Sequence, residues 1–499
     1  MMTNNIDFYK IIEQFAYNPQ SPMTFTSGLF LFVFCVFLIG YSLLKNRLSL
    51  RVLYIVLFSL FFYYKTSGIY FILLLFISLS DYAIGYALGT TEDKLKRKLL
   101  VLLSVSIDVG MLCYFKYTNF LFSIFSDLLN KPFDPLNIFL PIGISFFTFQ
   151  SMSYIIDIYR KRIHSVPYWI DYLFYISFFP QLVAGPIVRA RDFIPQIYQK
   201  SIFITREIFC EGYILILIGL FKKSIISDYI SLNFVDGVFD APMAYSGLEN
   251  LMAIYGYALQ IYCDFSGYSD IAIGIALMIG FRFNKNFDSP YKSATITEFW
   301  RRWHISLSSW LKDYLYISLG GNRKGRVRTY INLMITMLIG GLWHGASFKF
   351  IIWGGLHGIG LGVHKFVMQH FPSFKAQGMD MTSGWRRILG IIITFNFVCF
   401  TWIFFRAADL NIVQQMLSQI FTDFRPNLLL DFISGYRWVL ILMCLGFVFH
   451  FLPERWDDKL KELSLYIPLP VKAVVITMLI WIIMQTKSPD IQPFIYFQF

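Results

Sequence analysis

Two histidines are the residues of this sequence best suited to chemistry, because each directly follows a tryptophan. The pairs Trp303-His304 and Trp343-His344 stand forty positions apart, separated by a basic loop and an apolar run. A hydroxyl is a poor nucleophile at neutral pH until a base takes its proton, and histidine, with a pKa of about 6.5, suits that task. General-base catalysis contributes roughly 10²–10⁴-fold to a rate. We therefore predict that His344 is the catalytic base for a hydroxyl attacking a thioester, and that His304 is a second, assisting residue.

The length of the helix that ends at His344 predicts how deep this residue lies in the membrane. Tyr330 and His344 are fourteen positions apart, or about 21 Å at ~1.5 Å per residue. If the helix starts at a cytoplasmic interface marked by Arg326 and Arg328, it falls short of the ~30 Å hydrocarbon core. His344 is then predicted to lie inside the membrane, toward its outer side. Gly340, Gly341 and Gly345 would let neighbouring backbone or a substrate approach closely.

The segment around His304 is predicted to lie nearer the cytoplasm. If it is helical, Trp300, His304, Ser308 and Lys312 share one face through their i+4 spacing. A lone histidine is more often a satisfied core residue than a functional one. We apply that interpretation to the other five histidines of the chain, His164, His357, His364, His370 and His450.

The sequence lacks the motifs that are typical of several other classes of enzyme. The sequence has no Gly-x-Ser-x-Gly elbow, no Walker loop and no His-Glu-x-x-His. Its six cysteines contain no Cys-x-x-Cys pair and lie in or beside apolar runs, so they predict neither a disulfide framework nor a metal site. Direct acyl transfer with histidine as base therefore fits better than a serine-hydrolase, ATPase or zinc mechanism.

Composition places these residues in a membrane protein. The chain of 499 residues is 56% hydrophobic and 15% charged, whereas a soluble domain carries about 25% charged residues. Apolar runs of about 18 residues bounded by basic loops are typical of membrane-spanning helices. The net charge of +12 comes from short clusters between these runs. That distribution is the one the positive-inside rule produces, and it argues against nucleic-acid binding.

The predicted fold is an all-α polytopic membrane protein with about a dozen crossings. Residues 1–499 form a single integral membrane domain, with flanking transmembrane helices at 28–130 and 437–486. The first apolar run, Gly28 to Leu44, is followed by basic residues instead of a cleavage site, so we interpret it as a retained span. The basic loops at Lys45, Lys94 and Arg160 are predicted to be cytoplasmic and the N-terminus external.

Two apolar stretches carry unusual residues. Pro180, Gly185 and Pro186 interrupt one of them, which breaks a helix and leaves either a kinked core helix or a re-entrant element. Asp264 and Asp270 stand in another. They either have a structural role, capping a broken helix, or face a polar tunnel, and we favour the structural role. The loop of residues 227–247 carries acids and no Lys or Arg, so it is predicted to face outside.

Several of these segments resemble the membrane-bound O-acyltransferase superfamily. The two signature segments are Phe299-Trp300-Arg301-Arg302-Trp303-His304-Ile305-Ser306-Leu307-Ser308 and Leu342-Trp343-His344-Gly345. Further matches resemble its bacterial alginate O-acetylase-like branch: Pro141-Ile142-Gly143-Ile144-Ser145-Phe146-Phe147-Thr148-Phe149-Gln150, Phe179-Pro180-Gln181-Leu182-Val183-Ala184-Gly185-Pro186-Ile187, Asp264-Phe265-Ser266-Gly267-Tyr268-Ser269-Asp270 and Leu319-Gly320-Gly321-Asn322-Arg323. The resemblance covers about residues 140–405.

The resemblance implies a ring of helices with re-entrant elements around a central tunnel. It also implies an essential histidine at His344, a second one at His304, an acetyl donor on the cytoplasmic side and an acceptor outside. The residues predicted to bind the substrates surround the two histidines and the basic loop: Trp303, Trp343, Arg301, Arg302, Ser308, Arg323, Lys324 and Arg326. The basic cluster, which also includes Arg328, either binds the phosphates of coenzyme A or only anchors the chain at the membrane surface.

These features favour an acetyltransferase of the plasma (inner) membrane. It would move acetyl groups from cytoplasmic acetyl-CoA, a substrate and not a bound cofactor, for O-acetylation of a cell-envelope or exported polysaccharide such as alginate or peptidoglycan. The segments after Phe405 are too short to cradle a polymer, so an esterase-like periplasmic acetyltransferase partner is expected beside membrane lipid and the polysaccharide acceptor. The alternatives are D-alanyl transfer to teichoic acid, disfavoured by the glycine-rich loop at Gly320, and a non-catalytic transporter or channel, which would show paired discontinuous helices.

The loop charges predict a topology that labelling can test. Residues 94–98, 160–162 and 323–328 should face the cytoplasm, and residues 228–240 the outside. Single cysteines placed in these segments, on a background lacking the native cysteines, should react with an impermeant reagent only from the predicted side. Labelling of residues 323–328 from outside would contradict the orientation.

Overall fold

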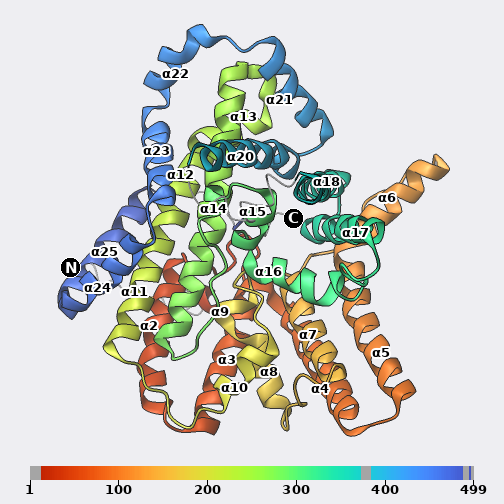
Figure 1. Ribbon diagram of the computed structural model, residues 1–499. Coiled ribbons are helices and arrows are strands. Elements are labelled where there is room, and N and C mark those ends of the chain that lie inside the picture. The colour runs from red at the N-terminus through yellow and green to blue at the C-terminus, as the bar shows by residue number, and fades with distance from the viewer. Residues whose placement is uncertain (1–12, 372–383, 487–493, 496–499) are drawn as a thin grey trace. The chain divides into compact units, whose positions relative to one another are not determined.

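The computed structural model describes residues 13–371, 384–486 and 494–495 of the chain. Within these residues the secondary structure is helical and contains no strand, which confirms the all-α prediction (Figure 1). The chain divides into two compact units, Met1–Gly212 with Ala272–Phe283, and Tyr213–Ile271 with Asn284–Phe499. The single integral membrane domain stays a prediction, and part of the N-terminus predicted to be external, residues 1–12, lies outside the described residues.

The apolar runs of the first unit fold into helices, as predicted. They are α2 (Gly28–Leu44), α3 (Leu48–Ser67), the 3₁₀ turn η1 (Gly68–Tyr70), α4 (Phe71–Thr90), α5 (Lys94–Leu112), the π-helical η2 (Cys113–Tyr117), α6 (Thr118–Leu129), α7 (Ile144–Tyr159), α8 (Trp169–Ser177), α9 (Phe179–Leu182) and α10 (Ala190–Ile197). Two further helices, α11 (Arg206–Leu220) and α14 (Gly247–Met278), have residues in both units.

The second unit contains the segment with both histidines. Its short early elements are η3 (Phe221–Ser227), α12 (Asp228–Ile230), η4 (Ser231–Val235), α13 (Asp236–Asp240), η5 (Pro242–Ala244) and η6 (Pro290–Lys292). They are followed by α15 (Ile296–Arg302), α16 (Ile305–Trp310), η7 (Leu311–Tyr316), α17 (Arg326–His344) and α18 (Phe348–His370). The remaining elements are α20 (Trp385–Arg406), α21 (Leu410–Thr422), η8 (Pro426–Leu428), α22 (Leu429–Gly435), α23 (Arg437–Phe451), α24 (Arg455–Tyr466) and α25 (Leu469–Thr486).

The predicted helix break lies in the core of the first unit. Helix α8 ends at Ser177, and the chain turns through the short helix α9 before α10 begins. Phe179, the first residue of α9, packs in the centre of an aromatic cluster, with its ring 4.9 Å from Phe58, 5.6 Å from Phe37 and 6.0 Å from Phe62. The break itself is confirmed. Its backbone is buried by protein, as irregular backbone must be at membrane depth.

Two expectations for the acidic segments of the second unit are wrong. Residues 227–247 do not form a loop but wind through α12, α13 and two π-helical segments, where Asp236 is paired with Arg406 at 2.6 Å. Asp264 and Asp270 do not cap a broken helix, since both lie within the unbroken α14. The helix can contain both acids because each is paired with a lysine: Lys223 lies 2.6 Å from Asp264, and Lys222 lies 2.7 Å from Asp270. These pairs support the structural role that the sequence favoured.

Glycines allow α17 and α18 to pack backbone against backbone (Figure 1). A Cβ atom on Gly341 would overlap the carbonyl oxygen of Phe350, and a Cβ atom on Gly354 would overlap that of Met337. A Cβ atom on Gly345 would overlap the Phe350 ring. The glycines before and after His344 therefore serve the contact between these two helices, which fixes the end of α17 where His344 stands.

Four segments are long and apolar enough to cross a membrane. They are Leu48–Thr90, Lys94–Leu129, Phe348–His370 and Trp385–Arg406. A fifth is reached if the pair Pro426–Gly435 and Arg437–Phe451, bent by 92°, counts as one broken span. These segments were identified among the described residues by their length and composition alone. They establish several candidate spans, while the dozen crossings and the ring of helices stay predictions.

Neighbouring glycines of α18 give a matched test of this packing. Gly354→Ala should destabilise the protein by about 1–3 kcal/mol, because the new methyl group overlaps backbone that has no room to move. Gly355→Ala should be neutral or slightly stabilising, because its Cβ would meet only the Leu338 side chain, at 3.6 Å. Thermal unfolding of the purified variants in detergent measures the difference. Equal midpoints for the two variants would contradict the close contact of the helices.

Candidate active site

The backbone breaks at His304, which places its side chain differently from the helical prediction. Helix α15 ends at Arg302, Trp303 is extended, and His304 has φ 43° and ψ 57°, in the left-handed region. The expectation that Trp300, His304 and Ser308 share the face of one helix is therefore wrong. A positive φ is strained for a residue other than glycine. Local hydrogen bonds offset this strain: the Ile305 N–H donates to the Asn286 carbonyl oxygen at 2.8 Å, and the Ser308 hydroxyl donates to the Trp303 carbonyl oxygen at 3.1 Å.

The side chain of Asn286 fixes the His304 ring. Its Oδ1 atom accepts from the Ser306 N–H at 3.1 Å and from the Ser306 hydroxyl at 2.8 Å, and lies 3.2 Å from His304 Nδ1. A backbone N–H can only donate, so the Asn286 atom at this position must be the oxygen. His304 therefore carries its proton on Nδ1 and presents an unprotonated Nε2. The Asn286 amide is itself held, because its Nδ2 donates to the Ser269 hydroxyl at 3.2 Å.

Burial keeps the His304 ring neutral. The side chain is completely buried, and this desolvation lowers the pKa of His304 well below its ordinary value. A neutral ring with Nδ1–H can accept a proton or a hydrogen bond at Nε2. Sequence reasoning missed Asn286, which stands 18 positions before His304 in a segment without helical pattern or motif. No signal in the sequence alone pointed to it.

His344 lies in the same aromatic cluster as His304. It is the last residue of α17, is buried, and packs between Trp353, with ring centroids 5.0 Å apart, and Phe405, at 5.3 Å. The ring of Trp343 bridges the two histidines, with centroids 5.0 Å from His344 and 6.2 Å from His304. Two residues forty positions apart in the sequence are thus brought together in space.

Large aromatic side chains enclose the cluster. Trp303 lies 5.0 Å from Trp402, which lies 5.8 Å from Trp353, and all three are almost fully buried. An enclosure of this kind has few dipoles and a low effective dielectric, so a charge formed on either histidine is poorly solvated there. Trp303 and Trp343 therefore pack in the same aromatic cluster as the histidines, and their contact with a substrate stays a prediction.

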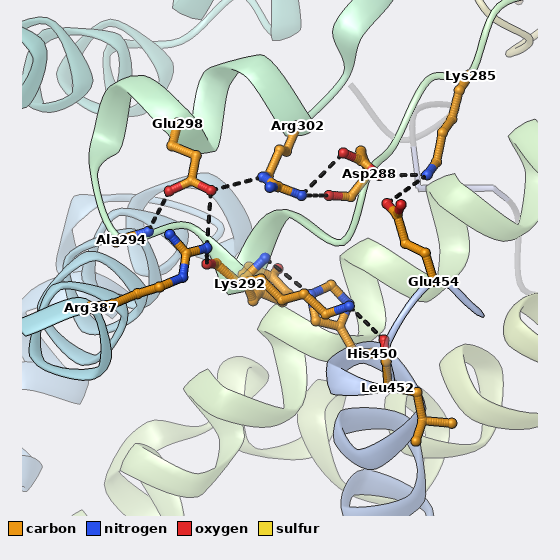
Figure 2. A network of polar contacts seen from close by, with 11 residues as sticks. Lys285, Asp288, Lys292, Ala294, Glu298, Arg302, Arg387, His450, Leu452 and Glu454 are labelled. Carbon is orange, nitrogen blue, oxygen red and sulfur yellow. Dashed lines mark hydrogen bonds and ion pairs between the residues drawn. The ribbon is translucent and has the colours of Figure 1, made fainter. Parts of the chain in front are cut away.

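The two arginines before Trp303 have different surroundings. Arg302 belongs to an ion-pair network, in which Nε lies 3.0 Å from Glu298 and Nη1 lies 3.1 Å from Asp288 (Figure 2). Arg387 reaches the same Glu298 carboxylate at 3.3 Å. Arg302 therefore joins α15 to the segment before it, and Glu298 joins α15 to α20 through Arg387. Arg301 lies on the exposed side of α15.

Glu298 is a second residue that sequence reasoning missed. Its N–H donates to the Thr295 hydroxyl at 3.1 Å. Its carboxylate accepts from the Ala294 N–H at 2.8 Å (Figure 2). This arrangement resembles a capping box, whose signature is a threonine followed three positions later by a glutamate. That signature, Thr295-Ile296-Thr297-Glu298, was present in the sequence and predicts the start of α15.

The basic loop is ordered and exposed at the opposite end of α17 from His344. Arg323, Lys324 and Arg326 are exposed, and no acidic partner pairs with them among the residues that the structure describes. Gly320 and Gly321 have positive φ, and the Asn332 amide donates to the Gly321 carbonyl oxygen at 3.0 Å. Since α17 has 19 residues, the loop and His344 are separated by about 27 Å at ~1.5 Å per residue. The structure does not bring these groups together directly.

Of the remaining histidines, those inside the protein have the surroundings expected of a core residue, whereas for the exposed His164 and His370 that expectation is wrong. His357 accepts from the Trp300 indole N–H at 3.2 Å and lies 3.0 Å from the Thr401 hydroxyl. His364 lies 2.8 Å from the Thr297 hydroxyl, and His450 accepts from the Tyr291 N–H at 3.0 Å. His370 lies 3.0 Å from the Phe366 carbonyl oxygen, and His164 is exposed. Over the described part of the chain, no group of three or more His, Cys, Asp or Glu side chains has the arrangement of a metal site.

Comparison with known proteins bears on this site. Residues 144–414, which include both histidines, match the family described as MBOAT, membrane-bound O-acyltransferase. The chain is 40% identical over 405 residues to a probable alginate O-acetylase of Pseudomonas putida, covering 80% of each protein. It is 38% identical over 426 residues to a peptidoglycan O-acetyltransferase of Helicobacter pylori, covering 79% of each. A teichoic acid D-alanyltransferase of Bacillus subtilis is 30% identical over 282 residues, covering 54% of this chain and 70% of that protein.

Proposed function

This chain belongs to the membrane-bound O-acyltransferase family and is an O-acyltransferase, and we propose that it transfers acetyl groups from cytoplasmic acetyl-CoA across the membrane to a polysaccharide of the cell envelope or an exported polysaccharide. The observation that carries the proposal is the pair of buried histidines joined through Trp343. Acetylation is supported by the relatives, because the alginate and peptidoglycan O-acetyltransferases match 79–80% of the chain.

The proposed reaction is a direct transfer between a thioester and a hydroxyl. His344 takes the proton of the acceptor hydroxyl as its oxygen attacks the acetyl carbonyl carbon. The new C–O bond forms, the C–S bond of the donor breaks, and the proton ends on the sulfur of coenzyme A. His304, whose Nε2 carries no proton, receives a hydrogen bond from an N–H or O–H of a reactant and orients it from the donor side.

The family resemblance also suggests the membrane, the fold and the partner of the proposed reaction. We place the enzyme in the plasma (inner) membrane as one multi-pass domain, with about a dozen crossings and re-entrant elements in a ring around a tunnel. The basic loop and His344 stand at opposite ends of α17. A donor held by Arg323 and Lys324 on the cytoplasmic side would therefore reach the histidines only by extending along that helix. An esterase-like periplasmic acetyltransferase completes the transfer to the polymer.

The runner-up is D-alanyl transfer to teichoic acid, which uses the same chemistry with a carrier-protein thioester as donor. The 30% identity to the Bacillus subtilis D-alanyltransferase favours it as the second candidate. The two are separated by the donor: acetyl-CoA supports the first function, and a D-alanyl thioester of a carrier protein supports the second.

The catalytic role of His344 is tested by substitution. His344→Ala and His344→Gln should each lower acetyl transfer by at least ~100-fold, because general-base help of this size is lost. The protein should still insert into the membrane. The measurement is transfer of radiolabelled acetyl from acetyl-CoA by purified protein with its partner, or the acetyl content of the envelope polysaccharide. His304→Ala should be impaired to a smaller degree.

A matched control is His370→Ala, which changes an exposed histidine at the end of α18. This variant should transfer acetyl at the wild-type rate. Near-normal transfer by a stably expressed His344→Ala protein would end the catalytic claim and leave His344 as a packed core residue.

The donor role of the basic loop is tested by removing its charge. The triple variant Arg323→Gln, Lys324→Gln, Arg326→Gln should raise the apparent KM for acetyl-CoA while leaving kcat largely unchanged, because phosphate binding is made equally in ground and transition states. The control removes three exposed charges elsewhere, with Lys94→Gln, Lys96→Gln and Lys98→Gln on α5. An unchanged KM in the correctly inserted loop variant would mean that the loop serves only as a membrane-surface anchor.

A further inference from the structure

Two carboxylates lie buried among the helices of the first unit, remote in sequence from the histidines. Asp81 stands near the middle of α4 and Asp108 in α5, and both side chains are completely buried. Each belongs to a candidate membrane span, Leu48–Thr90 and Lys94–Leu129 respectively. Acidic residues inside a membrane are rare, costly to bury, and associated with ion or proton sites.

The oxygens of this pair are joined by two serine hydroxyls. The Ser104 hydroxyl donates to Asp81 Oδ1 at 2.7 Å. The Ser151 hydroxyl, from α7, lies 2.9 Å from Asp108 Oδ2 and also within hydrogen-bonding distance of Asp81 Oδ2. A serine hydroxyl has one hydrogen, so it can donate to only one of these carboxylates at a time. The other close oxygen contact requires a further proton, or a cation, between the groups.

A second observation points to the same place. The Tyr172 side chain, from α8, is completely buried, and its hydroxyl has no hydrogen-bond partner within the described residues. It faces the Asp81 carboxylate and the Ser151 hydroxyl. The Oδ1 atom of Asp108 is likewise buried without a partner. Where the carboxylates meet, two buried polar atoms, one on Tyr172 and one on Asp108, are therefore left without a hydrogen-bond partner among the described residues.

No basic side chain in the described part of the chain forms an ion pair with either carboxylate. The titratable groups that face the pair are the tyrosines Tyr154 and Tyr172, both neutral at physiological pH. The Tyr154 hydroxyl is already engaged, accepting from the Val166 N–H at 3.1 Å. Arg97 of α5 donates instead to backbone carbonyl oxygens, among them Leu88 at 2.6 Å. No cationic side chain in the described residues therefore balances the negative charge of Asp81 and Asp108.

We propose that Asp81 and Asp108 form a binding site for one small monovalent cation, a proton or Na⁺, held between their carboxylates. Carboxylate and hydroxyl oxygens are hard ligands that suit either ion. One bound cation cancels one of two like charges that cannot both be stable so close together in a medium of low dielectric. The site shares no residue with the histidine cluster, and the proposal does not rest on the acyl transfer proposed above.

Infrared spectroscopy of the purified full-length chain tests the site. In Na⁺-free buffer, the wild type should show the C=O stretch of a buried protonated carboxyl at neutral pH, where an exposed aspartate, with a pKa of about 4, is ionised. The double variant Asp81→Asn, Asp108→Asn keeps the shape and hydrogen-bonding capacity of the neutral acids and should lack this band. The matched control Asp127→Asn, an exposed acid of the same candidate span as Asp108, should keep it.

Sodium distinguishes the two cations. If the site takes Na⁺, adding NaCl at alkaline pH should remove the band and raise the thermal unfolding midpoint by several degrees over choline chloride, in the wild type and not in the double variant. If it takes only a proton, raising the pH should remove the band and NaCl should have no effect. A band that neither alkaline pH nor Na⁺ removes would mean two neutral acids that merely hold the helices together. That result would overturn the proposal, and so would a wild-type spectrum identical to that of the double variant.

Discussion

The hydrogen bonds of Asn286 are the interactions on which the histidine site most depends. His304 occupies a left-handed backbone conformation that costs free energy, of order 1–3 kcal/mol. The backbone carbonyl of Asn286 receives the Ile305 N–H, while its side-chain oxygen receives the Ser306 N–H and faces His304 Nδ1. One residue therefore stabilises the break between α15 and α16 and selects which ring nitrogen of His304 carries the proton. Without that break, the histidine would continue the surface of a helix.

The second constraint is the close contact of α17 and α18. Their glycines bring the two backbones together, so that His344 at the end of α17 packs on Trp353 of α18 and on Phe405 of α20. Trp343 then completes the bridge to His304. The reaction proposed above needs a base beside a hydroxyl nucleophile in a site shielded from water. The packing supports that proposal, because large aromatic side chains enclose both imidazole rings.

Much of this arrangement could be predicted from the sequence, and the exceptions share a physical cause. The apolar runs marked the long helices, because helix formation in such segments depends mainly on local composition. The two Trp-His pairs indicated the candidate site, and they do lie in one aromatic cluster. The break at His304, by contrast, depends on a hydrogen-bond partner 18 positions away, which no local pattern encodes. The same holds for the acids of residues 227–247, predicted as an external loop. Asp236 is paired with Arg406, a residue of a distant helix, and the segment is helical. In both places a contact between residues far apart in the sequence decides the local structure, and the local sequence pattern does not.

The most direct test of the account is the pH dependence of acetyl transfer by Asn286→Asp. An aspartate keeps the acceptor beside His304 Nδ1 but adds a negative charge, which stabilises the protonated ring and raises the pKa of His304 above its value in the wild type. Because the proposed reaction uses the neutral ring, the acidic limb of the rate profile should move to higher pH. Asn286→Leu should lower the rate by about 10-fold or more, since a buried donor loses its partner. The exposed Asn396→Asp should leave the profile unchanged. A folded, inserted Asn286→Asp enzyme with the wild-type profile would contradict the role of Asn286 and His304 in the reaction.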